Sequence, residues 1–365
     1  MKVAIVHYWL VNMRGGEKVI EALLEMFPQA DIFTHVYNPK TVSPQINAQT
    51  VYTSRINRLP LSKKLYQLYL PLMPAALADF NLQPYDLVIS SEAGPAKGVV
   101  PKPGAYHLCY CHSPMRYIWD MHHEYLREAG AAARFFMRQI TPALRTWDIT
   151  SANMVDKFIT NSDYVAKRIE RVYRRKAEVV WGPAPIEKYL DRERAPEDFY
   201  LFFGQITGYK RADIAIEACI QSKRKIVVAG AGLKKSAARK YEKTGLVKVL
   251  GRVSDEKAAE LFAGARALLY PGIEDMGLVP IEANAAGCPV IAFAGGGALE
   301  TVAENLTGLF FAEQNTQSLA AALDFFEKNE SLFQNRENFR LHVQKFSKAA
   351  FQERVRRVLE EKSRI

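Results

Sequence analysis

Two glutamates eight residues apart, Glu274 and Glu282, have the residue type and spacing to bind the hydroxyl groups of a polyol. Between them lie Gly277 and Leu278, where a loop after an apolar strand gives way to an expected helix. Free backbone N–H groups at a helix start bind anions, and a glycine allows close approach. We therefore expect phosphate at Gly277 and Leu278, sugar hydroxyls at Glu274 and a second polyol such as ribose at Glu282. From the spacing alone, two solvated glutamates favoured by the helix dipole fit equally well.

Two further turns carry groups that suit phosphate. Lys210 and Arg211 follow an apolar strand and begin a helical pattern, and a lysine supplies a point charge for phosphate. Gly15 and Gly16 follow the first strand and open the first expected helix, so their N–H groups are free to face a phosphate or an acceptor oxygen. Such a pair alone is a weak signal, because many strand-to-helix turns use glycine for geometry only.

The segment from Tyr270 to Ile291 closely resembles the E-x7-E signature of retaining glycosyltransferase family four. The resemblance continues through Gly295-Gly296-Gly297 and Glu300-Thr301-Val302, and it extends over nearly the whole chain. It implies a GT-B fold, in which two Rossmann-like domains with parallel sheets face each other across a cleft. It also implies a retaining reaction without a metal ion, with the nucleotide held mainly by the C-terminal domain.

The segment Phe203–Arg211 resembles the family's strand-loop-helix that carries an arginine and a lysine for the diphosphate. Lys210 falls on the lysine position, whereas Gln205 replaces the arginine. A glutamine donates a hydrogen bond without a charge, so the resemblance places the diphosphate on Lys210, with help from Arg211.

Two further segments are assigned through the resemblance. Val247–Asp255 is similar to the segment whose backbone reads the base, so Arg252 and Val253 are expected at the nucleotide. Gly15 and Gly16 fall where the family places the donor diphosphate and the acceptor.

The stretch Tyr110–Asp120 resembles a bacterial mannosyltransferase subgroup within the family. His112 lies at the carboxyl end of an expected strand and matches the histidine that hydrogen-bonds the donor hexose. The resemblance therefore assigns catalytic roles to His112, Glu274 and Lys210. A histidine satisfied in the core is the alternative for His112.

Alternating strand and helix patterns position these residues. Apolar, β-branched strand runs separated by amphipathic helices are typical of parallel sheets covered on both faces, which makes this an α/β protein. The expected strands are Lys2–Tyr8, Asp31–Tyr37, Asp86–Ser91, Tyr106–His112, Lys157–Asn161, Phe199–Phe203, Lys225–Ala229, Val247–Gly251, Ala267–Tyr270, Pro289–Phe293 and Gly308–Phe311. Ligands bind such sheets at the carboxyl ends of the strands.

A proline- and glycine-rich linker, Trp181–Pro185, separates two halves of the chain. We expect an acceptor-side domain over residues 1–182 and a nucleotide-sugar domain over residues 183–345. Residues 346–365 are expected to form a C-terminal helix that packs back on the first domain.

Composition excludes several classes of protein. The net formal charge of +10 fits an anionic partner or a merely basic surface, but no helix-turn-helix, zinc-finger or RNP pattern accompanies it, so we expect no nucleic acid. Cys109 and Cys111, expected on opposite faces of one strand, have no second pair to complete a zinc site, and we expect buried thiols and no metal. No apolar run approaches the roughly 20 residues of a membrane span. We expect a cytoplasmic protein, soluble or peripheral at the inner face of the plasma membrane.

Three functions stay open at this point. The first is a mannosyltransferase that uses GDP-mannose, without a further cofactor, on a glycan or polyprenyl-diphosphate-linked acceptor of O-antigen or other cell-surface polysaccharide assembly. The second keeps the fold and changes the donor to a UDP-sugar or another GDP-sugar. The third is a non-catalytic nucleotide-sugar-binding partner. Basic and aromatic residues in Arg58–Leu70 and Arg134–Trp147 fit contact with anionic lipid, or equally two core-facing helices with snorkelling lysines.

Overall fold

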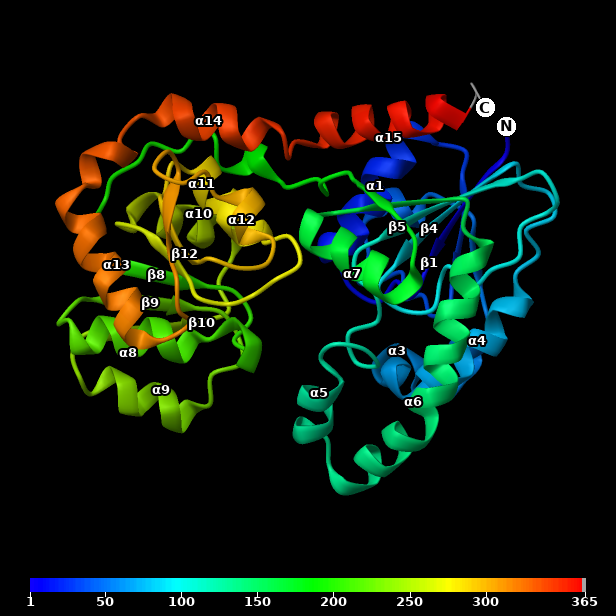
Figure 1. The fold of residues 1–365 in the computed structure, drawn as a ribbon, viewed down its shortest axis with the longest axis horizontal. Coiled ribbons are helices and arrows are strands. Elements are labelled where there is room, and N and C mark those ends of the chain that lie inside the picture. The colour runs from blue at the N-terminus through cyan, green and yellow to red at the C-terminus, as the bar shows by residue number, and fades with distance from the viewer. Residues whose placement is uncertain (363–365) are drawn as a thin grey trace. The chain divides into compact units, whose positions relative to one another are not determined.

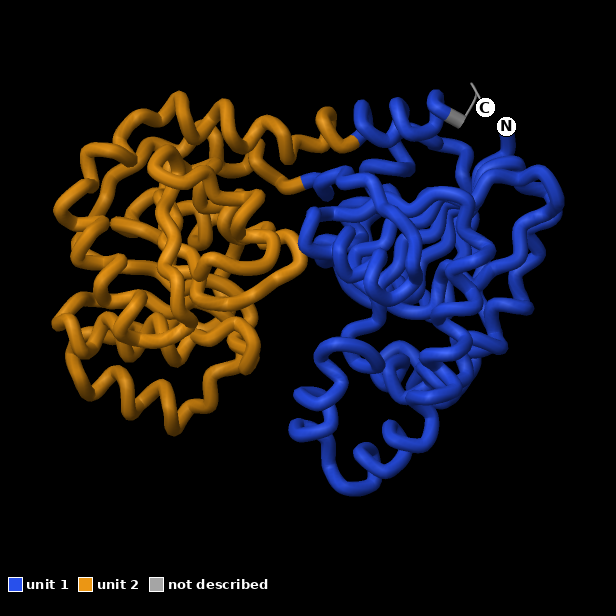
Figure 2. The backbone as a smooth tube through the Cα atoms, viewed as in Figure 1, with its two compact units in different colours: residues 1–183, 352–365 blue, residues 184–351 orange. Residues whose placement is uncertain are grey.

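The computed structural model describes residues 1–362. The chain divides into two compact units (Figure 2): unit 1 holds residues 1–183 and the chain from 352 on, and unit 2 holds residues 184–351. The expected first boundary after residue 182 lies one residue before the observed one after 183. The expected second boundary after 345 falls too early, because residues 346–351 belong to unit 2.

Unit 1 is built on a seven-stranded parallel sheet with the strand order β3-β2-β1-β4-β5-β6-β7 (Figure 1). Every residue of the two central strands β1 and β4 is buried, as expected for strands covered on both faces. The strands are β1 Val3–His7, β2 Asp31–Thr34, β3 Val51–Thr53, β4 Leu87–Glu92, β5 Tyr106–Cys111, β6 Lys157–Thr160 and β7 Ala177–Val179. The sequence did not predict the two edge strands, β3 and β7.

The helices of unit 1 connect these strands, and the last helix of the chain docks on the first. Gln352 donates a hydrogen bond to the carbonyl of Ala22 at 3.0 Å, which fixes α15 beside α1 (Figure 1). The helices, including the 3-10 turns labelled η, are α1 Gly15–Met26, α2 Pro44–Asn47, η1 Arg55–Arg58, α3 Ser62–Leu65, η2 Tyr66–Leu72, α4 Met73–Ala76, η3 Leu77–Asp79, α5 His122–Glu128, α6 Ala131–Ser151, η4 Ala152–Met154, α7 Asp163–Tyr173 and α15 Lys348–Lys362.

Unit 2 contains a six-stranded parallel sheet with the order β10-β9-β8-β11-β12-β13. Its strands are β8 Tyr200–Phe203, β9 Ile226–Ala229, β10 Val247–Gly251, β11 Leu268–Tyr270, β12 Val290–Phe293 and β13 Gly308–Phe311. Its helices are η5 Ile186–Lys188, η6 Gly208–Lys210, α8 Ala212–Gln221, α9 Lys235–Glu242, α10 Asp255–Gly264, α11 Leu278–Ala285, α12 Ala298–Thr301, α13 Thr316–Lys328, η7 Glu330–Phe333 and α14 Arg336–Gln344.

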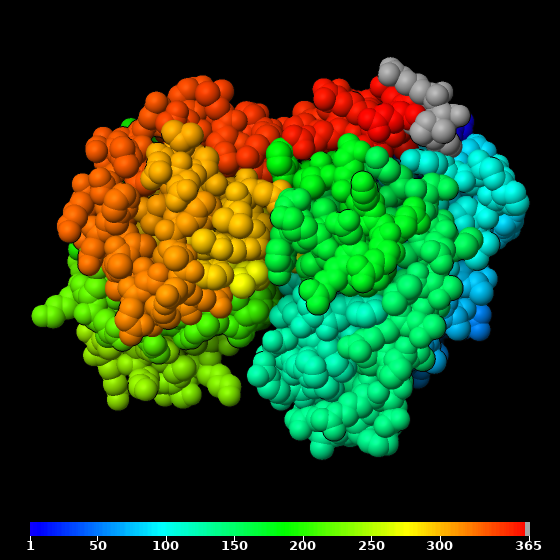
Figure 3. Space-filling model, viewed as in Figure 1, coloured from blue at the N-terminus to red at the C-terminus, as the bar shows by residue number. Residues whose placement is uncertain are grey.

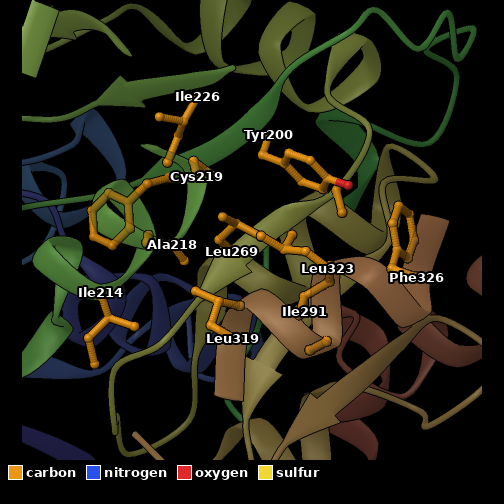
Figure 4. Close-up of a cluster of buried hydrophobic side chains, with 14 of the residues drawn as sticks. Tyr200, Ile214, Ala218, Cys219, Ile226, Leu269, Ile291, Leu319, Leu323 and Phe326 are labelled. Carbon is orange, nitrogen blue, oxygen red and sulfur yellow. The ribbon is translucent and has the colours of Figure 1, made fainter. Parts of the chain in front are cut away.

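The core of unit 2 lies between its sheet and the helices α8 and α13 (Figure 4). Ile214 on α8 and Leu319 on α13 pack with the strand residues Ile226, Leu269 and Ile291, and all five are almost fully buried. Each large aliphatic side chain removed from water in this way contributes about 1.5–3 kcal/mol. Two Rossmann-like units, each with its own parallel sheet and core, give the expected α/β fold class.

Each sheet reverses its strand order once. In unit 1 the chain goes outward from β1 to β2 and β3, then returns to place β4 on the other side of β1. In unit 2 the chain goes outward from β8 to β9 and β10, then returns to place β11 on the other side of β8. The carboxyl ends of the strands at such a switch point are where ligands bind in open α/β sheets. The residues that follow β1, β4 and β5, and those that follow β8 and β11, are therefore the candidates for chemistry.

The cysteine expectation needs a correction. Cys109 and Cys111 lie in one buried cluster with Phe158 and Tyr173, because residues two apart on a strand point to the same face. They do not lie on opposite faces. Across residues 1–362, no helix is both long enough and apolar enough to cross a membrane.

Candidate active site

In unit 1, two histidines and a serine meet at the carboxyl ends of three adjacent strands. His7 ends β1, Ser91 lies near the end of β4, and His112 directly follows β5. The Ser91 hydroxyl lies 3.1 Å from Nδ1 of His7 and 2.8 Å from Nε2 of His112. The main chain of His112 is held by Glu92, whose carbonyl accepts its N–H at 2.8 Å. The backbone therefore fixes the imidazole at the edge of the sheet.

The start of α1 lies beside this group, with Glu17 next to His7. Glu17 accepts a hydrogen bond from the backbone N–H of Arg14 at 2.8 Å, and its other oxygen lies 3.9 Å from Nε2 of His7. A side chain at Gly16 would lie 3.0 Å from the Tyr8 hydroxyl and 3.7 Å from Nε2 of His112. Gly16 therefore lies directly beside the Tyr8 hydroxyl and the His112 ring.

In unit 1, the surroundings of His112 and Glu17 lower the pKa of both groups. Burial lowers the pKa of His112 to about 3, so its imidazole is neutral near pH 7. For Glu17, burial alone would raise the pKa, but His7 and the backbone N–H groups outweigh it, and the pKa is lowered. The site therefore contains a neutral imidazole and a nearby carboxylate.

Lys97, Glu92 and Asp148 form a buried ion triad next to this edge of the sheet. Lys97 is fully buried, and its ammonium group donates to Glu92 at 2.7 Å and to Asp148. Asp148 also accepts from the Trp119 indole at 2.7 Å, and Trp119 belongs to the stretch that follows His112. This network connects the end of β4 with α6 and with the loop after β5.

In unit 2, the loop after β11 packs against the loop after β8. The Lys210 ammonium lies 2.9 Å from a carboxylate oxygen of Glu274, and both side chains are largely buried. A side chain at Gly272 would lie 2.7 Å from the Lys210 Cα, so glycine allows these two backbones to touch. The structure thus brings together the two unit 2 residues that were assigned catalytic roles.

The three consecutive glycines after β12 hold the Glu274 loop in place. The Gly297 N–H donates to the Glu274 carbonyl at 2.8 Å. A Cβ at Gly296 would lie 2.6 Å from that carbonyl oxygen, and one at Gly297 would lie 2.5 Å from the carbonyl oxygen of Asp275. Only glycine fits at Gly296 and Gly297 in this contact, whereas a Cβ at Gly295 would meet the Phe293 ring at 2.8 Å.

The α11 start and Glu282 lie as predicted from the sequence. Gly277 has φ +83°, a left-handed conformation that glycine adopts readily, and α11 begins at Leu278. Burial and repulsion from Asp255 raise the pKa of Glu282 to about 7, against the attraction of Lys188 and Lys210. Glu282 is therefore close enough to Lys210 for the two charges to interact.

The remaining expected residues of unit 2 are more exposed. Gln205 and Arg252 are exposed, and Val253 is half-buried beside the start of α10. Arg211 has φ +53° and its guanidinium pairs with Asp213 at 2.9 Å. The charge of Arg211 therefore already has a carboxylate partner.

Sequence reasoning missed several neighbours of the site. His7 and Ser91 in unit 1 carry no motif, whereas Glu17 directly follows the Gly15-Gly16 pair and Asp255 was noted only as part of a segment. Their common signal is position, since His7 and Ser91 lie at the carboxyl ends of β1 and β4. That signal needs the strand order, which the sequence did not supply.

A cavity of 680 Å³ in unit 2 lies away from these residues. Its lining includes Asp198, Arg266 and Pro289, which precede β8, β11 and β12 and so mark the amino ends of the strands. Arg266 is paired there with Glu330 at 2.6 Å. Within residues 1–362, no three His, Cys, Asp or Glu side chains are grouped as metal ligands.

Comparison with known families assigns both halves of the chain. Residues 13–187 match Glycosyltransferase Family 4, and residues 190–346 match Glycosyl transferases group 1. Among curated proteins, an uncharacterized glycosyltransferase of Methanocaldococcus jannaschii is 29% identical over 213 residues, which is 57% of this chain and 60% of that protein. The mouse alpha-1,3/1,6-mannosyltransferase ALG2 is 37% identical over 87 residues, 24% of this chain and 21% of that one. The matches thus span less than two thirds of these relatives' lengths.

Solved structures agree over the whole fold. Anabaena HepE, determined in complex with UDP-glucose, superposes with a TM-score of 0.71 at 17% identity, covering 99% of this chain and 100% of that one. WaaG, a glycosyltransferase involved in lipopolysaccharide biosynthesis, gives 0.67 at 18% identity, covering 97% and 98%. At such identities the likeness concerns the fold.

Proposed function

Because the two halves of this chain match two glycosyltransferase families and its fold matches solved GT-B structures, we propose that it transfers mannose from GDP-mannose to a glycan or lipid-linked acceptor, with retention of configuration. The observation that carries the proposal is the group at the carboxyl ends of β8 and β11. There Lys210 pairs with Glu274, and α11 begins four residues later at Leu278, directly after the left-handed Gly277. A cation, a free helix start and a buried carboxylate suit a diphosphate and the hydroxyls of its sugar and ribose.

The donor preference rests on fewer residues. The stretch Tyr110–Asp120 resembles a mannosyltransferase subgroup, and one relative is named as a mannosyltransferase. His112, Trp119 and Asp120 of this stretch are tied into unit 1 through Ser91, Asp148 and Arg168 respectively. These contacts fix the side chains of the stretch within unit 1.

The proposed reaction follows from where charge develops. As the bond between the anomeric carbon and the diphosphate oxygen breaks, negative charge grows on the leaving group and the sugar becomes oxocarbenium-like. Lys210 and the N–H groups at Gly277 and Leu278 stabilise that charge in place of a metal ion. The acceptor oxygen attacks from the same face, and its proton passes to the leaving phosphate.

Thermal unfolding with a ligand panel tests the donor. A ligand that binds only the folded state raises the midpoint by mass action, so GDP and GDP-mannose should each produce a shift. UDP, UDP-glucose and ADP are the matched comparisons. A shift with the UDP compounds alone would keep the enzyme class and replace the donor. No shift with any of them would favour a site weakened by Gln205 or a non-catalytic protein.

We also propose that unit 1 rests on anionic lipid through two neighbouring segments. Leu65, Leu68 and Leu72 are 40%, 70% and 52% exposed, and Phe135 and Phe136 are 60% and 65% exposed. Other residues of the two segments face the core, as the alternative considered from the sequence expected: Tyr66 and Tyr69 pack against one buried cluster, and Ile140 and Trp147 pack against another. The surface around the start of α6 protrudes from unit 1 (Figure 3).

The two segments belong to one surface region, because Leu70 and Ile140 pack against the same small cluster around Met115. Lys63, Lys64 and Arg138 are exposed beside the apolar side chains. Basic residues next to exposed leucine and phenylalanine are typical of peripheral contact with acidic headgroups.

Vesicle sedimentation tests this contact. The protein should bind vesicles that contain phosphatidylglycerol more strongly than phosphatidylcholine vesicles, and Phe135→Ser with Phe136→Ser should weaken binding about tenfold or more. Leu341→Ser is the matched control, since Leu341 is 66% exposed on α14 of unit 2. Equal binding by both variants would contradict the assignment of this surface.

A further inference from the structure

A chain of polar groups crosses the carboxyl edge of the unit 1 sheet from α1 to β5. Glu17 lies 3.9 Å from Nε2 of His7, Nδ1 of His7 contacts the Ser91 hydroxyl at 3.1 Å, and the same hydroxyl contacts Nε2 of His112 at 2.8 Å. His7, Glu17 and Ser91 are almost fully buried, whereas His112 is partly exposed. Among residues 1–362, none hydrogen-bonds Nδ1 of His112, which leaves that atom for a ligand.

Counting protons shows in which direction the hydrogen bonds donate along this row of polar groups. Glu17 is a carboxylate at neutral pH, because His7 and the backbone N–H groups lower its pKa. A carboxylate beside Nε2 of His7 favours the tautomer that carries its proton on that nitrogen. In the proposal below, His7 is taken in its neutral form, in which Nδ1 is a bare acceptor. The hydrogen bond with Ser91 then requires the hydroxyl to donate.

The direction continues to His112. A serine hydroxyl has one hydrogen, so Ser91 has only its lone pairs left for His112. The bond of 2.8 Å between them then requires Nε2 of His112 to carry the proton and donate it. Since burial lowers the pKa of His112 to about 3, the ring has a single proton, and Nδ1 is left without one.

We propose that Glu17, His7 and Ser91 act as positioning residues that fix the tautomer of His112, so that its free Nδ1 accepts a hydrogen bond from a sugar hydroxyl. The proposal rests on the function above for the identity of the ligand, but the tautomer relay itself does not depend on it. It assigns a role to Glu17, which follows the Gly15-Gly16 pair, and to His7 and Ser91, which belong to no recognisable motif. It also predicts that His112 accepts, rather than donates, at its exposed nitrogen.

Nitrogen-15 NMR of the full-length protein, labelled at its seven histidines, reads the tautomer directly. His112→Gln identifies the His112 signals. In the unmodified protein, Nε2 of His112 should be protonated and Nδ1 bare, with His7 in the same neutral tautomer. A His112 ring protonated at Nδ1 would overturn the proposal.

Two substitutions test whether the groups are coupled. Glu17→Gln replaces the carboxylate with an amide that can donate to His7, so the relay should reverse and the His112 nitrogen shifts should move toward the Nδ1-protonated form. In a Ser91→Ala background, Glu17→Gln should no longer move the His112 shifts toward the Nδ1-protonated form, because the connecting hydroxyl is gone. Glu21→Gln on the same helix is the matched control, since Glu21 pairs with Lys18 at 2.7 Å and contacts none of the relay groups. Equal effects of Glu17→Gln with and without Ser91 would also overturn the relay.

Fluorinated donor sugars separate the relay from its proposed ligand. Fluorine accepts but does not donate, so replacing the one hydroxyl that donates to His112 should weaken binding about tenfold in the unmodified protein. The loss should shrink in Glu17→Gln, where Nδ1 of His112 carries a proton. If the NMR coupling holds while no fluorinated donor is discriminated, the relay stands and the assignment of His112 to the donor sugar is wrong.

Discussion

At the scale of single residues, Glu282 combines a predicted role with an unusual environment. Burial and the nearby Asp255 raise its pKa to about 7. A hydroxyl donor binds the ionised carboxylate better than the protonated acid, so raising the pH through 7 should strengthen binding.

We expect the affinity for a nucleotide diphosphate-sugar to rise about tenfold between pH 6 and pH 8, because the ionised fraction of Glu282 rises by that factor. Isothermal titration calorimetry measures it, and the sugar diphosphate linkage itself does not titrate in this range. In Glu282→Gln the profile should be flat and the affinity at pH 8 lower. An unchanged slope in that variant would remove Glu282 from the site.

Gly297 supports the catalytic loop through its missing side chain. In Gly297→Ala the new Cβ would meet the Asp275 carbonyl at 2.5 Å, so the Glu274 loop must shift. We expect a loss of about 1–3 kcal/mol in the free energy of unfolding, measured in urea, together with weaker donor binding. Gly130→Ala, which meets nothing within 4 Å, should stay within about 0.5 kcal/mol. Similar values for both variants would contradict the contact.

How far the sequence predicts the site depends on how local each signal is. Glu274, Gly277 and Glu282 share one strand-loop-helix segment, so spacing alone placed them together. Ser91 and His112 meet only because β4 and β5 pair in register across 21 residues of sequence. No local pattern encodes that pairing, and the polar chain through Ser91 could not be predicted. The functional roles of the expected site residues stay predictions.

At the scale of elements, the buried triad around Lys97 holds β4, α6 and α7 together. Lys97 lies between the carboxylates of Glu92 and Asp148, and the Tyr173 hydroxyl from α7 donates to Asp148 at 3.0 Å. Removing one charge from such a group leaves the others buried and uncompensated.

Lys97→Met should therefore lower the free energy of unfolding by about 3–5 kcal/mol. Chemical denaturation followed by circular dichroism measures the loss. Lys18→Ala, which breaks the exposed pair with Glu21, is the control and should cost no more than about 1 kcal/mol. If the two variants lose equal stability, the triad does not have the structural role described here.

The elements differ in how well the sequence predicts them. Central strands such as β1 and β4 are runs of buried apolar residues, and their bounds agree with the expected runs within one or two residues. The edge strands β3 and β7 have three residues each and are only partly buried, so they lack that apolar run. Edge strands of this kind are defined by their pairing rather than by their composition.

At the scale of the whole molecule, α15 is the element that unit 1 receives from the far end of the chain. Val355 and Val358 are buried, and Gln352 bonds to α1. A C-terminal helix that packs back on the first domain was expected, and its buried valines lie in unit 1.

We expect Val355→Ala to destabilise unit 1 by about 2 kcal/mol through the lost burial and the resulting cavity. Hydrogen exchange should then quicken in β1 of unit 1 while β9 of unit 2 keeps its protection. Glu360→Ala, an exposed change on the same helix, should leave both strands unaffected. Faster exchange confined to β9 would contradict the assignment of α15 to unit 1.

The division of the chain has a consequence for its synthesis on the ribosome. Unit 2 is one continuous segment, residues 184–351, whereas unit 1 needs residues from both ends. Domains generally fold as they emerge, at about 5–20 residues per second of translation. All of unit 2 is therefore synthesised before unit 1 is complete. Until α15 leaves the exit tunnel, the surface of α1 on which α15 docks stays uncovered. Chaperones that bind nascent chains would meet this protein at that surface.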